Sequence, residues 1–278
     1  MKVVIMSFFR LCLTDAKYGF RYNRLRYLAV CGVFLLGLLW MRKELLEGSC
    51  YGILHGDATY TDAVLYLLRG MKRLYAEPYR LPLMWLINQA LLLSLTGGYP
   101  YSTSLTYRQQ VLLHHKKKTD WWYSKCLWCV GTVASFYLLC YVVAAVWCFL
   151  FHMPFQTAFS AEYAKIWYEV NMENVTGREL WLLLTVLPFA ISTAMALLQL
   201  FLGLAFGSQL AFLLSMGVQA ASTVLCLPWL PGNYSMILRS AVIDANGVET
   251  EWGLCLAAGI AFLSTLLGGA YIRKRDIL

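Results

Sequence analysis

The chain has 278 residues, of which 60% are hydrophobic and only 14% are charged. Soluble domains carry about 25% charged residues, so this composition excludes an ordinary soluble protein and indicates a membrane protein with several spans. The formal net charge of +8 would favour nucleic-acid binding in a soluble chain. In a membrane protein the positive-inside rule explains it, and no nucleic-acid partner is expected.

The first segment, residues 1–26, is basic and amphipathic. Its apolar residues, among them Phe8 and Leu11, fit one side of a helix, and its basic residues include Arg10 and Lys17. The segment lacks a small-residue cleavage site, which argues against a signal peptide. We expect a cytoplasmic amphipathic helix that lies on the inner leaflet and contacts membrane lipid.

Six apolar segments follow that are long enough, or nearly so, to cross a bilayer as helices. They lie at residues 27–41, 81–98, 126–151, 180–204, 210–227 and 252–272. The sequence therefore predicts an all-α integral membrane protein in which residues 1–278 form a single transmembrane domain. A helical patch at 62–75 is predicted to pack on the membrane face or on other helices, and the placement of residues 44–80 stays open.

Basic residues gather in the segments that an even number of spans would put on one side. Segments 1–26, 99–125 and 273–278 are rich in Lys and Arg, whereas the other connections hold most of the acidic residues. Because Lys and Arg mark the cytoplasmic side of a membrane protein, we expect both termini in the cytoplasm.

The predicted spans carry no charged residue and no His near their middle, which argues against an ion-coupled transporter. They carry uncharged polar residues instead. The candidates to line a translocation path are Gln199, Gln219, Ser222 and Thr223. Hydrogen bonding between packed helices is the other interpretation of the same residues.

The sequence shows no motif of a catalytic or metal site. Its four His do not have the spacing of zinc ligands, and neither G-x-S-x-G nor the phosphate-binding G-x-x-x-x-G-K-[ST] occurs. Cys126 and Cys129 form a C-x-x-C without a second pair. The carboxylates Asp57, Asp62 and Asp244 are expected in external loops. We therefore expect no catalytic residue, no cofactor and no metal.

The connection at 99–125 contains the run LTYRQQVLLHHKKKTDWWYSK. It predicts a short helix with an apolar side, followed by a basic run at 116–118 and an aromatic belt at 121–123. One interpretation is a juxtamembrane loop held by anionic lipid. The other is a cytoplasmic helix that docks into a groove of a partner. The candidate docking residues are Arg108, Gln109, Val111, Leu112, Leu113, His114 and His115.

Five stretches carry a resemblance to a known family. They are the basic N-terminal segment, PYRLPLMWLI, YRQQVLLHHKKKTDWWYSKCLW, LPGNYSMILRS and RKRDIL. With them the chain resembles the permease subunits of type-2 ABC exporters of the Gram-positive bacterial kind. The resemblance implies a half-transporter with six membrane helices and an amphipathic N-terminal helix. It also implies a coupling helix at 106–118 and a re-entrant external segment at 228–240.

The function implied by the resemblance is that of an ABC transporter permease in a bacterial cell membrane. Such a permease pairs with itself or with a similar permease, and a separate ABC ATPase subunit hydrolyses the ATP. We expect export of an amphipathic substrate, which is a peptide, a drug or a lipid-like molecule. Two alternatives stay open: a non-transporting assembly factor or sensor subunit, and a membrane-embedded enzyme, which would need a buried charged or metal-binding cluster.

Overall fold

The computed structural model describes residues 2–50, 58–72, 81–102, 118–168, 175–244 and 246–274. Within these ranges the chain is helical, with an isolated β-bridge between Ser240 and Val248 and no strand. The longer helices are α1 (Lys2–Cys50), α3 (Leu83–Ser102), α5 (Lys118–Leu150), α8 (Leu187–Phe206), α9 (Ser208–Val224) and α11 (Thr250–Lys274). The short ones are α2 (Tyr60–Leu68), α6 (Ala161–Tyr168), α7 (Gly177–Trp181), the π-turn η1 (Leu182–Val186), α10 (Gly232–Ser235) and the 3₁₀ turn η2 (Ile237–Arg239). The predicted all-helical class is confirmed.

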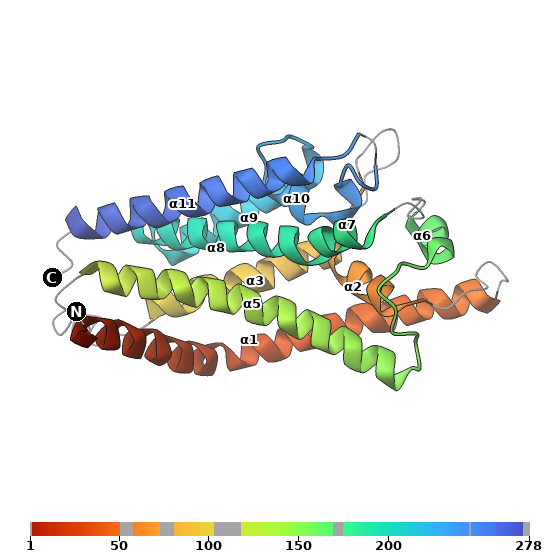
Figure 1. The fold of residues 1–278 in the computed structure, drawn as a ribbon, viewed down its shortest axis with the longest axis horizontal. Coiled ribbons are helices and arrows are strands. Elements are labelled where there is room, and N and C mark those ends of the chain that lie inside the picture. Colours follow the sequence, from red (N-terminus) through yellow and green to blue (C-terminus); the bar gives the residue numbers. More distant parts are fainter. Residues whose placement is uncertain are drawn as a thin grey trace.

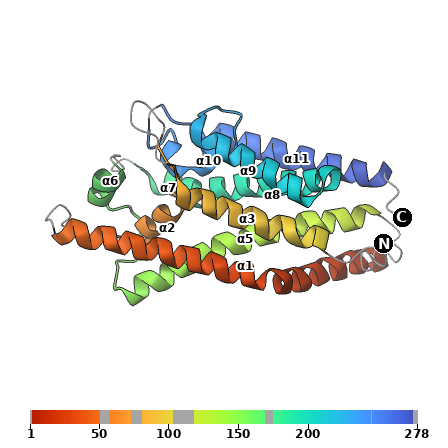
Figure 2. The same cartoon turned by 180° about the vertical axis from the view of Figure 1, so that it is seen from behind.

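The longer helices run side by side along the long axis of the molecule (Figures 1 and 2). The start of α1, the start of α5 and the end of α11 lie together at one end of the bundle, which we call the terminal end. The short helices α2, α6, α7 and α10 lie at the other end, which we call the distal end. Successive long helices therefore alternate in direction, which places the end of α3 and the start of α5 at the terminal end.

Four helices are long and apolar enough to cross a membrane: Phe8–Ser49, Thr119–Leu150, Gly177–Phe206 and Thr250–Lys274. Their outer surfaces carry large exposed apolar side chains, which are stable against lipid and unfavourable in water. Examples are Leu28, Leu138 and Phe262, at 67%, 63% and 63% exposed. These four helices indicate a membrane protein, and the residues that the structure describes fold into helices without strands.

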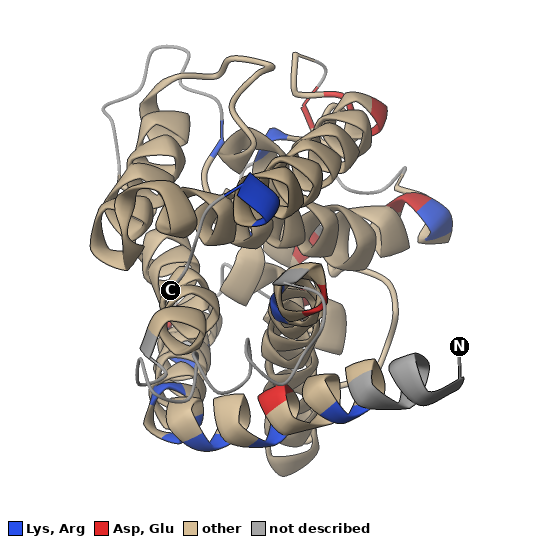
Figure 3. Cartoon of the chain, turned by 90° about the vertical axis from the view of Figure 1, so that its left-hand side faces the viewer, with Lys and Arg blue, Asp and Glu red and all other residues tan. Residues whose placement is uncertain are grey.

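The predicted surface helix at 1–26 and the predicted span at 27–41 form one continuous helix, α1. The physical reason is a single buried stripe that continues through both segments at helical spacing. Its members are Leu11, Asp15, Gly19, Asn23, Val30, Phe34, Leu38 and Met41. Viewed from the terminal end, the first part of α1 extends sideways across the bundle and carries much of the basic charge of that end (Figure 3).

The connection predicted at 99–125 is shorter than expected. Helix α3 continues to Ser102 and α5 begins at Lys118, because apolar residues on both sides pack into the bundle: Tyr99 is 2% exposed, and Trp121 and Trp122 are 5% and 0% exposed. The helical patch predicted at 62–75 is also shorter. Helix α2 ends at Leu68, before the positive φ of Gly70, and all of its residues after Tyr60 are buried between other helices.

Pro188 interrupts the backbone hydrogen bonding of the predicted fourth span, and α5 compensates for it. A proline lacks the N–H that would bond to the carbonyl four residues earlier, here Leu184. The hydroxyl of Tyr141 on α5 donates to that Leu184 oxygen at 2.8 Å. The π-turn η1 lies at the same place, where the N–H of Leu187 donates to the Leu182 oxygen. Helix α5 is thus joined to η1, the irregular turn that leads into α8.

Candidate functional site

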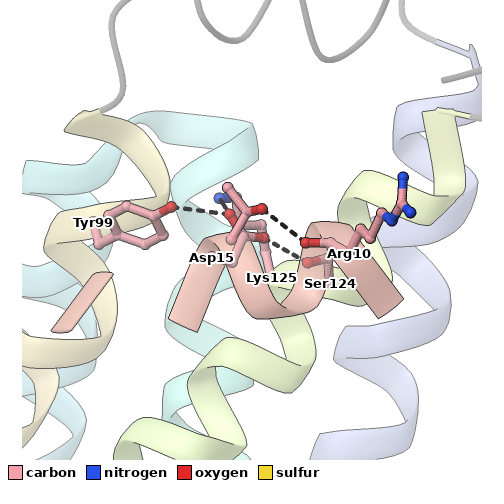
Figure 4. Close-up of polar contacts among 6 residues, drawn as sticks. Arg10, Asp15, Tyr99, Ser124 and Lys125 are labelled. Atoms are coloured by element: carbon pink, nitrogen blue, oxygen red, sulfur yellow. Dashed lines mark hydrogen bonds and ion pairs between the residues drawn. The ribbon is translucent and has the colours of Figure 1, made fainter. Parts of the chain in front are cut away.

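A buried carboxylate, Asp15, lies where α1, α3 and α5 meet at the terminal end (Figure 4). Its Oδ1 accepts a hydrogen bond from the hydroxyl of Tyr99 at 2.9 Å and lies 2.6 Å from Nζ of Lys125. Its Oδ2 accepts a hydrogen bond from the hydroxyl of Ser124. Asp15 and Lys125 are each 1% exposed, so water does not screen this ion pair.

Aromatic rings complete the surroundings of the Lys125 ammonium. Its Nζ lies 4.4 Å from the centre of the Tyr99 ring and 5.8 Å from that of Trp121, distances at which a cation is attracted to the ring face. Removing one partner of a buried ion pair leaves an uncompensated charge and costs about 3–5 kcal/mol. The cluster of Asp15, Tyr99, Ser124 and Lys125 therefore fastens three helices to one another.

The sequence interpretation missed this cluster. It assigned Asp15 to the surface segment 1–26 and Lys125 to the cytoplasmic connection 99–125, whereas both side chains are buried between helices. A usable signal was present, because Asp15 lies four residues after Leu11 and four before Gly19 on one helix face. The partner on α5 has no comparable signal.

A second polar junction joins α1 to α3 about two helical turns further along α1. The Nδ2 of Asn23 donates to the oxygen of Leu95 at 2.8 Å. The Nη1 of Arg26 donates to Oδ1 of Asn23 and to the oxygen of Ser94, both at 2.9 Å. These contacts hold the Arg26 guanidinium against the C-terminal half of α3.

The four candidate path-lining residues are all buried within this chain. Gln199 is 2%, Gln219 0%, Ser222 0% and Thr223 2% exposed. The Nε2 of Gln219 donates to Oε1 of Gln89 at 3.3 Å, which joins α9 to α3. The hydroxyls of Ser222 and Thr223 donate to carbonyls of α9 itself. The Gln219 contact thus joins two packed helices, whereas these two hydroxyl contacts stay within α9. A path lined by the four residues would require α3, α8 and α9 to separate.

The candidate docking residues lie outside the described residues. They are Arg108, Gln109, Val111, Leu112, Leu113, His114 and His115, within the stretch 103–117. The residues on both sides of this stretch are described. Tyr99 at the end of α3, and Ser124 with Lys125 near the start of α5, all contact Asp15. The helices on the two sides of this stretch, α3 and α5, therefore contact the same carboxylate on α1.

At the distal end, Asp62 is a buried carboxylate in α2, not a residue of an external loop as predicted. It accepts hydrogen bonds from the backbone and hydroxyl of Thr59, both at 2.9 Å, and from the backbone N–H of Ser160 at 3.0 Å. Burial raises the pKa of Asp62 above its ordinary value, against the lowering effect of the hydrogen bonds from Thr59 and Ser160. The carboxylate caps α2 and ties it to the segment before α6.

The segment 228–240, for which the resemblance implies a re-entrant structure, folds back between α8 and α9 at the distal end. Arg239, 1% exposed, holds it there. Its guanidinium donates to the carbonyl oxygens of Ser222 and Thr223 on α9 and to the side-chain oxygen of Asn233. Asn233 in turn donates to the carbonyl oxygen of Leu227 at 2.8 Å.

The C-x-x-C pair is buried against the bundle, with Cys126 at 7% and Cys129 at 0% exposed. Both are free thiols. Among the described residues, His, Cys, Asp and Glu side chains do not gather in a group of three or more that could hold a metal ion.

Comparison with known proteins gives one result that bears on the family. A family model described as "Protein of unknown function (DUF2705)" matches residues 29–278. No curated protein matches the chain.

Proposed function

The chain belongs to the family described as a protein of unknown function (DUF2705). On the basis of its sequence pattern, and not of this match, we propose that it is the permease subunit of an ABC exporter. It exports an amphipathic substrate, such as a peptide, a drug or a lipid-like molecule. A separate ABC ATPase subunit hydrolyses the ATP, and the permease pairs with itself or with a similar permease. The chain itself is a transport subunit and not an enzyme.

The proposed topology has six spans: α1, α3, α5, the unit from α7 to α8, α9 and α11. The four long apolar helices are four of them. Helices α3 and α9 have 20 and 17 residues, which at 1.5 Å per residue makes about 30 and 26 Å. The hydrocarbon core of a bilayer is about 30 Å thick, so both fit a span. Their position alongside the other four supports this topology (Figures 1 and 2).

The distribution of charge supports a cytoplasmic terminal end. Among the described side chains, the acidic ones of that end are Asp15 and Asp120, and the basic ones are Arg10, Lys17, Arg21, Arg24, Arg26, Lys125, Arg273 and Lys274. At the distal end the two signs are nearly balanced, with acidic residues such as Glu162, Glu249 and Glu251. By the positive-inside rule the terminal end faces the cytoplasm of a bacterial cell membrane.

One observation carries the proposal: α3 and α5, the helices that flank residues 103–117, both contact Asp15. If this stretch contains the coupling helix, a displacement imposed by the ATPase reaches α3 through Tyr99 and α5 through Lys125. Because both contact the same carboxylate, α1 moves with them. The three helices then rotate as one body against α8, α9 and α11, which opens the path to the other side. For ATP to drive this rotation, the complex must bind ATP more tightly in one of its two helix arrangements than in the other.

The test replaces the apolar side of the proposed coupling helix. The triple variant Val111→Asp, Leu112→Asp, Leu113→Asp inserts into the membrane and loses transport, because charged side chains cannot enter an apolar groove of the ATPase. The control Val111→Leu, Leu112→Met, Leu113→Met keeps the apolar character and retains transport. Flux is measured in proteoliposomes that contain permease and ATPase. Normal flux in the Asp variant would contradict the coupling-helix assignment.

A further inference from the structure

A cavity of about 480 Å³ opens at the terminal end between α1, α3, α8 and α9. Its lining combines the polar side chains of Arg26 and Gln199 with the apolar ones of Phe212 and Leu213. It therefore has one polar and one apolar side, and Arg26 is the charged residue of its lining among the residues that the structure describes.

Two adjacent glycines on α3 make room for the polar side of the cavity. A Cβ atom at Gly97 would lie 2.2 Å from Nε2 of Gln199, and one at Gly98 would lie 2.1 Å from Nη1 of Arg26. Any other residue at these positions would push the two side chains away. The Gly97-Gly98 pair thus lets an amide and a guanidinium approach α3 side by side at the cavity.

The two polar side chains have different hydrogen-bonding needs. The Arg26 guanidinium is held by Nη1 contacts to Asn23 and Ser94, which fixes a positive charge at the cavity wall and suits a phosphate or carboxylate. Gln199 is 2% exposed, and its Oε1 lacks a hydrogen-bond partner among the described residues. A buried acceptor without a partner is unfavourable, so a ligand that offers a hydroxyl or amine donor would stabilise it.

The apolar side of the cavity continues onto the outer surface of α9. Leu213 lines the cavity and is 64% exposed, and Leu210 and Leu214 beside it are 46% and 44% exposed. Because α9 lies alongside the spanning helices, this exposed apolar surface suits a hydrocarbon chain. A molecule with its head in the cavity can therefore extend its tail along α9.

We propose that this cavity binds the head of an acidic phospholipid that carries a phosphate and a hydroxyl, with the phosphate on Arg26 and the hydroxyl donating to Gln199. Phosphatidylglycerol is the simplest molecule with this chemistry, whereas phosphatidylcholine offers the phosphate but no donor. The site does not depend on the export proposal. A lipid bound here would stabilise the junction of α1, α3, α8 and α9 at the terminal end.

The experiment measures the lipid retained by the purified protein from nanodiscs of equal parts phosphatidylglycerol and phosphatidylcholine, by native mass spectrometry. The wild type is expected to retain phosphatidylglycerol preferentially, and Arg26→Gln to reduce that retention about tenfold, the equivalent of one charge-assisted hydrogen bond. The matched control is Arg24→Gln, which removes the same charge from an exposed position two residues away and should leave retention unchanged. Equal retention of both lipids by the wild type, or equal retention by the two variants, would overturn the proposal.

A second variant covers the case in which Arg26→Gln disturbs helix packing. Leu213→Trp fills the apolar mouth from an exposed position and is expected to weaken phosphatidylglycerol retention several-fold while the thermal unfolding midpoint in detergent stays unchanged.

Competition with glycerol 1-phosphate, added without lipid, distinguishes a lipid head group from a soluble phosphate as the ligand. Glycerol 1-phosphate should compete only weakly. Displacement of bound phosphatidylglycerol at low glycerol 1-phosphate concentration, together with wild-type retention by Leu213→Trp, would assign the cavity to a soluble ligand and contradict the proposal.

Discussion

The two ends of the bundle are held together by different kinds of interaction. At the terminal end an ion pair, between Asp15 and Lys125, joins three long helices through side chains. At the distal end Asp62 and Arg239 are also buried, but most of their hydrogen bonds go to backbone groups. Asp62 accepts from the N–H groups of Thr59 and Ser160, and Arg239 donates to the carbonyl oxygens of Ser222 and Thr223. The terminal end therefore links long helices that can move as bodies, whereas the distal end fixes short segments in place.

The comparison shows where movement can be transmitted. Backbone-directed contacts such as those of Arg239 hold a local fold, and breaking them loosens one segment. A side-chain cluster such as that of Asp15 connects α1, α3 and α5, and breaking it separates whole helices. Helices α3 and α5, which flank residues 103–117, both contact this cluster, so a displacement of either helix would be transmitted to α1.

The largest expected effect comes from Lys125→Met. The variant leaves the Asp15 carboxylate buried without its cation, so we expect a loss of about 3–5 kcal/mol in the free energy of unfolding. The control Lys17→Met removes an exposed charge from α1 and should change stability by less than about 0.5 kcal/mol. The double variant Asp15→Asn, Lys125→Met should regain part of the loss. Unfolding in detergent measures the stability of all three variants. If Lys125→Met has the same free energy of unfolding as the wild type, the proposed difference between the two ends is wrong.

A smaller loss is expected from Arg239→Met at the distal end. The substitution leaves the carbonyl oxygens of Ser222 and Thr223 without the guanidinium, and unsatisfied buried acceptors cost about 1–3 kcal/mol. The matched control is Arg178→Met, whose side chain is exposed. A cysteine introduced by Ser235→Cys reports on residues 228–240. Adding Arg239→Met should make this cysteine accessible to a membrane-impermeant thiol reagent, while α1, α3 and α5 stay packed. Unchanged protection of this segment would show that Arg239 does not hold it.

Gly268→Ala sharpens the comparison by testing a second contact at the terminal end. A Cβ there would lie 2.0 Å from the ring of Trp122, whose Nε1 donates to the Thr265 oxygen at 2.8 Å. Overpacking of this kind costs about 1–3 kcal/mol. Gly259 on the same helix has open space at the Cβ position, so Gly259→Ala should be neutral or slightly stabilising. Equal unfolding midpoints for the two alanine variants would refute the close packing of α5 on α11.

The smallest effect concerns the pH dependence contributed by Asp62. Because its pKa is raised in the folded protein, the unfolded state releases this proton first as the pH rises above about 4. The free energy of unfolding then falls until the pH passes the raised pKa. Asp62→Asn cannot ionise and lacks this slope. Between about pH 4 and 7 the free energy of unfolding should therefore fall more in the wild type than in Asp62→Asn. If the two proteins show the same dependence on pH, the raised pKa of Asp62 is contradicted.

The fold class and the helix positions could be predicted because apolar length is a local property. Each predicted span overlaps a helix of the structure, since about 20 apolar residues mark a span without knowledge of its neighbours. The continuity of α1 was missed because basic residues interrupt its apolar run while its buried stripe continues through Gly19 and Asn23. The six-span count and the orientation stay predictions.

The candidate site could be predicted only in part. The stretch 103–117 was selected from its own pattern, but the contacts of its flanking helices with Asp15 join residues that are 84 to 110 positions apart. Pairing at such separation is decided by packing and leaves no local trace. The path-lining residues show the same limit, because Gln219 is polar in the sequence whether it faces a path or, as here, Gln89.

The central claim is tested most directly by purifying the tagged chain from its native host and identifying the proteins that accompany it by mass spectrometry. The account predicts a stoichiometric soluble subunit that carries G-x-x-x-x-G-K-[ST], which is retained by the Val111→Leu, Leu112→Met, Leu113→Met control and lost from the triple Asp variant. A preparation that lacks such a subunit in mild detergent and again in nanodiscs would contradict the permease account and favour an assembly factor or sensor.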